Sequence, residues 1–488
     1  MTSKPKSPSF LLAFVPIFVL IILLILNVLI FKDDATGGPN QIALILAAVA
    51  GVIVAIPLGY KWEQLQKGIV DSITSALPAV LILLLIGALA GTWMMSGVVP
   101  TMIYYGLEIL NPTIFLVAAC IVSAIVALAT GSSWTTIATV GVALIGIGTA
   151  LGIGQGMVAG AIISGAYFGD KMSPLSDTTN LAPAMAGTDL VTHIRYMALT
   201  TIPSILITLA IFLIIGFTIE TKETSQGVGA MMEAISAKYY VSPILFIVPV
   251  IVVFLIIKKV SAVPALFVGT ILGAISAIIF QPEIIKEIGG SNSSYFTSSY
   301  KASMISMSMN TSVDTGLAEV NKLLGTSGMA GMLNTIWLIV CAMCFGGVME
   351  AAGLLSKITH TVVKFAKSTG SLIATTAGTC VFFNATASDQ YLAIVVPGKM
   401  FEDIYPERGL APENLSRTLE DSGTVTSVLF PWNTCGATQS SVLSVATGDY
   451  WMYSFFNLIS PAMTIFYGYA GIKIKKIENK ELKMKTQK

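Results

Sequence analysis

The sequence predicts an all-α polytopic membrane protein built from two inverted repeats with broken helices. Three observations support this prediction. Hydrophobic residues make up 55% of the 488 residues and charged residues only 11%, against roughly 25% charged residues in soluble domains. Apolar runs of near-spanning length recur along the chain. Polar interruptions in the first half return at matching positions in the second half, which is typical of secondary transporters.

Seven apolar segments form the first half. The first follows a short basic N-terminus, but its run of about 21 residues is longer than the 7–15 residues of a signal-peptide core. No small-residue cleavage site follows it, so we expect a retained span. The predicted segments cover about 10–31, 40–59, 77–97, 112–130, 134–152, 155–168 and 194–218.

The second half repeats the first with an offset of 256 residues. Gly91 corresponds to Gly347, Ser132 to Ser388, and Asp177 to Asn433. A polar stretch separates the halves, and a second polar stretch, 281–330, is expected to be a long loop. The predicted organisation is a first repeat at 1–218, an external linker at 219–242, a second repeat at 243–470 and a basic cytoplasmic tail at 471–488.

Loop charges indicate that the two repeats are inverted. Segment 98–112 contains Glu108 and no lysine or arginine, whereas its counterpart 355–370 contains three lysines. Residues from Gly471 onward include seven lysines and two glutamates. The positive-inside rule then places the N-terminus and the C-terminus in the cytoplasm. Matching loops lie on opposite sides, so the halves are expected to be antiparallel.

Four polar islands interrupt the apolar sequence. They are Thr130–Thr136, Gly169–Asn180, Asn384–Asp389 and Pro431–Gly436. Glycine and proline beside them break helices and free backbone groups, which are tolerated at membrane depth only where protein or a wet cavity surrounds them. Hydroxyl, amide and carboxylate oxygens there suit Na⁺, Li⁺ or divalent ions rather than soft metals. The alternative is that the islands are loop tips outside the bilayer.

Asp177 is the main candidate for ion coupling, because hydroxyls surround it and Pro174 disrupts the helix before it. A carboxylate that holds either a proton or a cation provides for exchange. Capping of a helix end is the structural alternative for this residue. The other coupling candidates are Asp389, Asp170 and Glu350. The candidates for cation or substrate binding are Thr130, Ser132, Ser133, Ser176, Thr178, Asn180, Asn384, Thr386, Ser388, Asn433 and Thr434.

Structural roles compete with function at several of these charged positions. Asp170 and Lys171 are adjacent, which is equally typical of solvated charge at a mouth. Glu350 can snorkel to the membrane edge. Glu420 and Asp421 precede the fourth island, and they either line a cytoplasmic path or are solvated.

Other classes of function find little support in the sequence. A serine hydrolase would need a base near Ser132 and Ser133, but the two histidines, His193 and His360, are far away in sequence, so we expect no enzyme. Cys341 and Cys344 have metal-ligand spacing without a second ligand pair, and we expect helix packing there. No cofactor and no bound metal are expected beyond transported Na⁺. No basic domain supports nucleic-acid binding.

Long motifs resemble the NhaC family of bacterial sodium/proton antiporters. They are Thr130–Thr136, Gly169–Thr178 and Leu419–Thr424 leading to Pro431–Gly436, and the resemblance covers nearly the whole chain. It implies an ion-transporter type fold with re-entrant hairpins, and exchange of Na⁺ or Li⁺ for H⁺ across the bacterial inner membrane. The family also contains malate/lactate antiporters coupled to Na⁺ and H⁺, so a small carboxylate remains the alternative substrate. A homodimer is compatible with the sequence.

Overall fold

A computed structural model describes residues 5–31, 35, 37–109, 111–219, 225–363 and 366–477. Four of the charged segments discussed above fall partly outside these ranges: residues 1–4 of the N-terminus, residues 220–224 of the linker, Lys364 of segment 355–370, and residues 478–488 of the tail. Within the described ranges the secondary structure is helical, apart from two isolated β-bridges, Thr311–Thr326 and Leu410–Lys476.

The first half contains long helices and several short, broken ones. Helix α5, for example, begins with a proline at its first position, Pro112. Asn111 before it is the N-cap, and its side chain accepts a hydrogen bond from the N–H of Thr113. The elements are α1 (Phe10–Phe31), α2 (Pro39–Ala55), η2 (Ile56–Leu58), α3 (Trp62–Met95), α4 (Val98–Ile109), α5 (Pro112–Thr130), α6 (Ser133–Thr136), the π-helix η3 (Ile137–Gly141), α7 (Val142–Ala150), α8 (Gln155–Met172), α9 (Asp177–Ala186) and α10 (Leu190–Thr218).

The second half follows the same plan after the connecting helix α11 (Ser225–Lys238). Its elements are η4 (Pro243–Phe246), α12 (Ile247–Ile257), α13 (Ala262–Phe280), α14 (Pro282–Gly289), α15 (Tyr295–Ser308), α16 (Ala318–Leu323), η5 (Gly328–Met332), α17 (Leu333–Ala351), α18 (Leu354–Val363), α19 (Thr369–Thr386), α20 (Leu392–Phe401), α21 (Ile404–Glu407), α22 (Pro412–Leu419), the π-helix η6 (Glu420–Thr424), η7 (Ser427–Leu429), α23 (Thr434–Leu443), α24 (Thr447–Tyr450), η8 (Trp451–Tyr453) and α25 (Phe455–Ala470).

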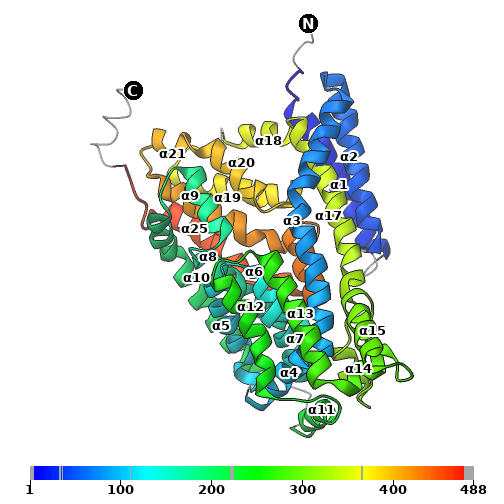
Figure 1. Cartoon of the computed structure of the whole chain (residues 1–488). Coiled ribbons are helices and arrows are strands. Elements are labelled where there is room, and N and C mark those ends of the chain that lie inside the picture. Colours follow the sequence, from blue (N-terminus) through cyan, green and yellow to red (C-terminus); the bar gives the residue numbers. More distant parts are fainter. Residues whose placement is uncertain are drawn as a thin grey trace.

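The halves are arranged in opposite directions. Helices α4 and α18 begin 256 residues apart (354 minus 98). In Figure 1, α4 lies at the lower end of the molecule and α18 at the upper end. The long helix α3 descends toward α4, whereas its neighbour α17 ascends toward α18. The inverted-repeat architecture predicted from loop charges is therefore the architecture of the fold.

Eight helices in the described residues are long and apolar enough to cross a membrane. A ninth span results if the pair Gly227–Lys238 and Pro243–Ile257, which bends by 84°, is counted as one. Large apolar side chains cover outward faces; Leu11 and Leu29 of α1, for example, are 79% and 70% exposed. Exposure of this kind in a polytopic chain is surface for lipid contact.

Several predicted loops are helical instead. Segment 98–112 contains α4, segment 355–370 contains α18, and segment 281–330 contains α14, α15 and α16. These helices are amphipathic, and their polar faces lower the average hydropathy of the segment to that of a loop. Helix α14, for instance, buries Ile284 and Ile285, whereas Lys286 and Glu283 form an ion pair on its exposed face. Helix α3 also begins 15 residues before the predicted boundary at 77, because its first turns carry charged side chains.

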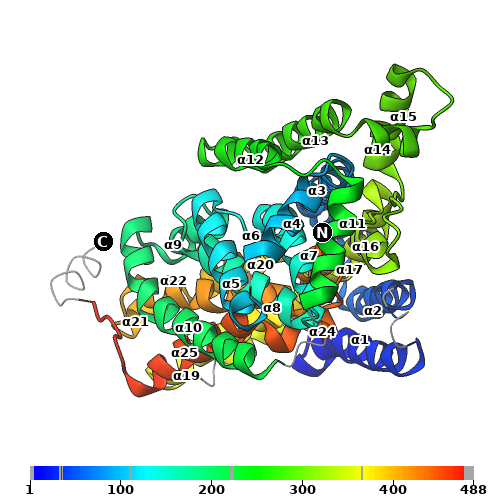
Figure 2. The same ribbon diagram turned by 90° about the horizontal axis from the view of Figure 1, so that it is seen from below.

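Small residues let the scaffold helices approach closely. A Cβ atom on Gly347 of α17 would lie 2.6 Å from the carbonyl oxygen of Gly68 in α3, as in other close helix pairs of membrane proteins. Seen from below in Figure 2, α12 and α13 lie along one edge of the molecule, opposite α10, α19 and α25. The broken helices of the two halves lie between these edges.

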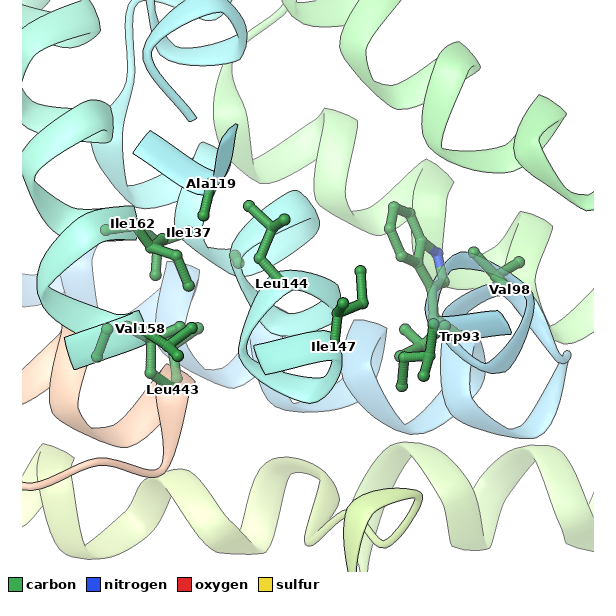
Figure 3. Close-up of a cluster of buried hydrophobic side chains, with 14 of the residues drawn as sticks. Trp93, Val98, Ala119, Ile137, Leu144, Ile147, Val158, Ile162 and Leu443 are labelled. Atoms are coloured by element: carbon green, nitrogen blue, oxygen red, sulfur yellow. The ribbon is translucent and has the colours of Figure 1, made fainter. Parts of the chain in front are cut away.

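A packed apolar core supports the broken segment η3–α7. Figure 3 shows Ile137, Leu144 and Ile147 of this segment between Val158 and Ile162 of α8 and the side chains of Trp93 and Val98. The buried indole of Trp93 donates a hydrogen bond to the carbonyl oxygen of Gly269 at 3.1 Å. The core therefore fixes the helix that follows the first polar island.

Candidate ion-binding site

All four polar islands contribute to one cavity of about 780 Å³. Side chains from α3 and from the turn between α12 and α13 complete its wall. The nine predicted site residues that line the cavity are Thr130, Ser132, Asp170, Ser176, Asp177, Thr178, Asn180, Asp389 and Thr434. Residues far apart in the sequence, from both halves, thus meet at one place.

The first island contacts the second at Gly131. Gly131 ends α5 with a φ of +69°, a left-handed conformation that favours glycine. A Cβ atom there would lie 2.7 Å from the backbone carbon of Leu175. The next residue, Ser132, caps α6 by accepting a hydrogen bond from the N–H of Thr135 at 3.2 Å. The island is therefore a tight turn between two half-helices, and its position explains the glycine.

Asp170 is a buried carboxylate held by the first island. Its Oδ2 accepts a hydrogen bond from the N–H of Ser133 at 2.9 Å and another from the hydroxyl of Ser133 at 2.7 Å. The residue is only 7% exposed, and it lines the cavity. A charged acceptor with two donors of this kind is fixed in orientation. Ser133 itself is behind the wall and reaches the cavity through Asp170.

The second island joins α8 to α9 through Pro174 and Ser176. Ser176 caps α9 and hydrogen-bonds Thr178 at 3.1 Å, hydroxyl to hydroxyl. The amide of Asn180 donates to the carbonyl oxygens of Pro174 and Ser176 at 3.0 and 2.7 Å, which closes the turn. Asp177 lies at the first position of α9, on the cavity wall, and its side chain is exposed. The structure thus places Asp177 at the rim and Asp170 inside.

The third island supplies a second buried carboxylate. Asp389 is 5% exposed, and its Oδ1 accepts a hydrogen bond from the N–H of Leu392 at 2.9 Å. Ser388 before it has a φ of +60°, which is uncommon for a residue with a Cβ atom. Its carbonyl oxygen accepts from the N–H of Thr434 in the fourth island at 3.0 Å. Asp389 occupies the position that corresponds to Ser133, but Asp389 lines the cavity, whereas Ser133 contacts Asp170 from behind the wall.

The amides of Asn384 and Asn433 are used within the protein. Asn433 caps α23 by accepting from the N–H of Cys435 at 3.0 Å, and its Nδ2 donates to the carbonyl oxygen of Asn384 at 3.0 Å. The amide of Asn384 donates to the carbonyl oxygen of Gly423 at 2.7 Å. Both residues are buried and neither lines the cavity. Their placement ties the third island to the fourth.

Three further predicted residues lie away from the cavity wall. Thr386 and Ser388 are buried behind it, and the hydroxyl of Thr386 donates to the carbonyl oxygen of Phe382 in its own helix at 2.7 Å. Glu350 is exposed near the end of α17 and is not part of the wall.

A buried charged cluster beside the cavity was not among the predicted site residues. Lys171 and Asp421, both fully buried, form an ion pair between the two halves. Ser460 accepts from the ammonium group of Lys171 at 2.9 Å, and the hydroxyl of Thr200 donates to Oδ2 of Asp421 at 2.8 Å. Glu420, also fully buried, accepts a hydrogen bond from Thr178 at 3.1 Å. The sequence signal for this cluster was the two pairs of adjacent charges, Asp170-Lys171 and Glu420-Asp421. Such pairs are equally typical of helix ends that are exposed to solvent.

Carboxyl and hydroxyl side chains from both halves line the cavity. Carboxylate and hydroxyl oxygens are typical ligands of hard cations. In the ranges that the structure describes, no three His, Cys, Asp or Glu side chains are grouped closely enough to hold a metal ion. Asp170, Asp177 and Asp389 are the carboxyl side chains that line the cavity.

Comparisons with known proteins show the family of this chain. A family model described as the Na⁺/H⁺ antiporter family matches residues 165–472. The Na⁺/H⁺ antiporter NhaC of Alkalihalophilus pseudofirmus is 38% identical over 90% of this chain and 91% of that protein. The malate-2H⁺/Na⁺-lactate antiporter of Bacillus subtilis is 36% identical over 94% of each chain. The arginine/ornithine antiporter ArcD of Halobacterium salinarum is 38% identical over 96% of this chain and 93% of its own. The chain therefore belongs to the NhaC family of sodium/proton antiporters.

Proposed function

We propose that this protein exchanges Na⁺ or Li⁺ for H⁺ across the bacterial cytoplasmic membrane, with Asp170 and Asp389 as the carboxylates that bind these ions. The observation that carries the proposal is the cavity itself. It brings one buried carboxylate from each inverted half to the same wall, where Asp177 adds a third at the rim. The proposal includes no enzymatic activity.

Mutually exclusive binding at these carboxylates provides the coupling. A carboxylate that carries a proton has lost the negative charge that attracts Na⁺, so the two ions compete for the same oxygens. The polar groups that bind Na⁺ replace its water. Thr130, Ser132 and Thr434 line the cavity, and this proposal assigns that role to their hydroxyls. Movement of one inverted half against the other then exposes the cavity to each side in turn.

The end of the molecule that carries α18 is assigned to the cytoplasm in this proposal. The dark blue segment that leads into α1 and helix α21 lie at that end in Figure 1. Lys61 and Lys357 belong to segments at the same end. Cytoplasmic segments are enriched in lysine and arginine. Labelling of single cysteines at positions 61 and 108 in intact cells tests the assignment: only position 108 is expected to react with a membrane-impermeant maleimide.

Proton flux in proteoliposomes tests the exchange. The purified full chain is reconstituted with a pH-sensitive dye trapped inside, and Na⁺ or Li⁺ is added outside. We expect the interior to become more alkaline as cations enter and protons leave. K⁺ at the same concentration is the control for osmotic and surface effects. Absence of a Na⁺-dependent or Li⁺-dependent pH change, with the protein demonstrably inserted, would falsify the proposal.

A small organic carboxylate is the second candidate substrate, and the size of the cavity favours it. A water molecule occupies about 30 Å³ in the liquid, so about 780 Å³ leaves room for far more than a partly hydrated Na⁺. Lys259, in the turn between α12 and α13, lies on the same wall and could pair with an anionic group. In this alternative, Na⁺ and H⁺ are the coupling ions and malate or lactate is the cargo.

Counterflow of labelled malate separates the two candidates. Proteoliposomes loaded with unlabelled malate accumulate the label only if the protein carries malate. Uptake that depends on Na⁺ and is lost in Lys259→Ala supports the second candidate. Na⁺/H⁺ exchange without malate uptake supports the first.

A further inference from the structure

A second cavity lies at the outer surface of the molecule, and we call it the outer groove. It has a volume of about 400 Å³, and its wall combines residues of α1, α18, α19 and α25. Figure 2 shows α19 and α25 along one edge of the molecule. The residues that line the outer groove are mainly apolar or small, and none of them lines the ion cavity. The outer groove is therefore a separate feature of the fold.

One face of α19 forms most of the wall. Its residues are three or four positions apart, as residues on one face of a helix are: Ser371, Ala374, Thr375, Gly378, Thr379 and Phe382. Gly378 is exposed, and a Cβ atom there would meet no atom within 4 Å outside its own helix. Glycine weakens the interior of a helix, and Gly378 has neither a positive φ nor a close helix contact that requires it. Its effect here is to keep the outer groove open.

The length of the outer groove matches one leaflet of a bilayer. The 11 residues from Ser371 to Phe382 (382 minus 371) rise about 16 Å along the helix, and half of the hydrocarbon core is about 15 Å. At the Phe382 end, the rings of Phe14 and Phe382 lie 6.4 Å apart between centroids. At the Ser371 end, Tyr469 is 64% exposed and contacts the backbone at Gly370. Tyrosine is typical of the membrane–water interface, so the Ser371 end is suited to the headgroup region.

Charge near the Ser371 end is positive. Lys357 precedes Ile358 of the groove wall, and the exposed Lys367 comes one helical turn before Ser371. The chain segments that supply the wall, 5–31, 353–382 and 455–477, contain no aspartate or glutamate. An anionic group at this end of the outer groove therefore meets lysines and no carboxylate from the segments that form it. Basic groups beside an apolar surface are the combination that binds acidic lipid headgroups.

We propose that the outer groove binds an anionic phospholipid, with one acyl chain along α19 and the headgroup at Lys357 and Lys367. The apolar wall and the length of about 16 Å fit the chain, and the two lysines fit the phosphate. A second copy of this chain is the less favourable occupant. A two-fold contact brings the same patch of both copies together, so the lysines of one copy would face those of the other. The inference does not depend on the proposed Na⁺/H⁺ exchange.

Lipid binding to the purified full chain in detergent tests the headgroup site. Phosphatidylglycerol and phosphatidylcholine with identical acyl chains are titrated, and bound lipid is counted by native mass spectrometry. We expect the wild type to prefer phosphatidylglycerol about thirtyfold, or by about 2 kcal/mol for two lysines. The double variant Lys357→Gln/Lys367→Gln should lose this preference. The control Lys301→Gln/Lys322→Gln removes two exposed lysines from α15 and α16 and should keep it.

The variant Gly378→Leu tests the acyl-chain site. Leucine at this position fills part of the outer groove, so we expect the affinity for phosphatidylglycerol to fall roughly tenfold, the value of about two buried methylene groups. Gly229→Leu is the matched control. Gly229 is also an exposed glycine within a helix, α11, and a Cβ atom there would likewise meet no atom within 4 Å. Its substitution should leave lipid binding unchanged.

Four results decide the inference. Equal affinity of the wild type for the two lipids overturns it, and so does unchanged phosphatidylglycerol binding in Gly378→Leu. A change from dimer to monomer in Gly378→Leu with lipid binding unchanged also overturns it, because the outer groove would then be an interface between copies. If Gly378→Leu is not recovered as monodisperse protein, the double lysine variant decides: loss of the preference supports the inference, and its persistence overturns it. Lipid binding requires no transport, so failure of Na⁺/H⁺ exchange in proteoliposomes leaves these results unaffected.

Discussion

Ser133 and Asp170 are joined by two hydrogen bonds, from the N–H and the hydroxyl of one residue to a single carboxylate oxygen of the other. The N–H belongs to the first turn of α6, where backbone donors have no partner within the helix. The start of a half-helix thus holds a carboxylate beside the ion cavity.

Loss of the Ser133 hydroxyl should loosen this carboxylate. In Ser133→Ala the backbone N–H still donates to Asp170, so the site persists with one bond fewer. A hydrogen bond to a charged group contributes about 1.5–3 kcal/mol, and we expect the Na⁺ concentration for half-maximal exchange to rise roughly tenfold or more. Transport rates at varied Na⁺ measure it. Unchanged Na⁺ dependence would show that Oδ2 has no part in positioning the ion.

Asp177 is expected to matter less than the two buried carboxylates. The sequence alone predicts that Asp177→Asn abolishes exchange and that adding Asn433→Asp restores some coupling. In the structure Asp177 is at the exposed rim, and the amide of Asn433 faces other protein groups. We therefore expect Asp177→Asn to weaken Na⁺ dependence while exchange continues, and the second substitution to give no rescue. Complete loss of exchange in Asp177→Asn, with folded protein, would return Asp177 to the centre of the site.

The Lys171–Asp421 ion pair should make a large difference to stability when only one partner is removed. Removal of one member of a buried pair leaves an uncompensated charge and costs roughly 3–5 kcal/mol. We expect Lys171→Met and Asp421→Leu each to lower the melting temperature in detergent strongly. The double variant should recover much of the loss, because apolar side chains of similar size can replace a buried pair. Additive losses in the double variant would contradict the pairing.

Gly131 should tolerate no side chain, and Gly187 provides the matched control. Both have positive φ, +69° and +77°. A Cβ atom at Gly131 would clash with Leu175, whereas nothing lies within 4 Å at Gly187. Alanine at either position costs about 1–2 kcal/mol for the left-handed conformation. Only Gly131→Ala should also separate the first two islands and reduce exchange. Equal effects of the two substitutions on transport would mean that the contact with Leu175 is unimportant.

The broken helices of this fold are predictable because glycine, proline and hydroxyl residues interrupt apolar runs. These residues act on the backbone nearby, so Gly131, Pro174 and Ser176 each predict a turn at their own position. Asp170 and Asp389 were likewise recognisable as carboxylates in such turns, although their binding of ions stays a prediction.

Contacts between residues far apart in the chain could not be predicted from the sequence. Lys171 and Asp421 are 250 positions apart, and each follows another charged residue, a pattern equally typical of a solvated helix end. Asn433 was expected at the cavity because Asp177 occupies the matching position. Its amide instead caps α23 and binds Asn384, a difference of orientation that spacing does not encode. Amphipathic helices such as α14 were missed because their hydropathy averages to that of a loop.

Na⁺-driven proton flux in proteoliposomes containing Asp170→Asn or Asp389→Asn tests the central claim most directly. The control is Asp189→Asn, because Asp189 is exposed and caps α10 by accepting from Thr192 at 2.9 Å, which asparagine also does. We predict loss of exchange in both cavity variants and wild-type exchange in the control, with all three proteins folded and inserted. Full Na⁺/H⁺ exchange in both Asp170→Asn and Asp389→Asn would contradict the account.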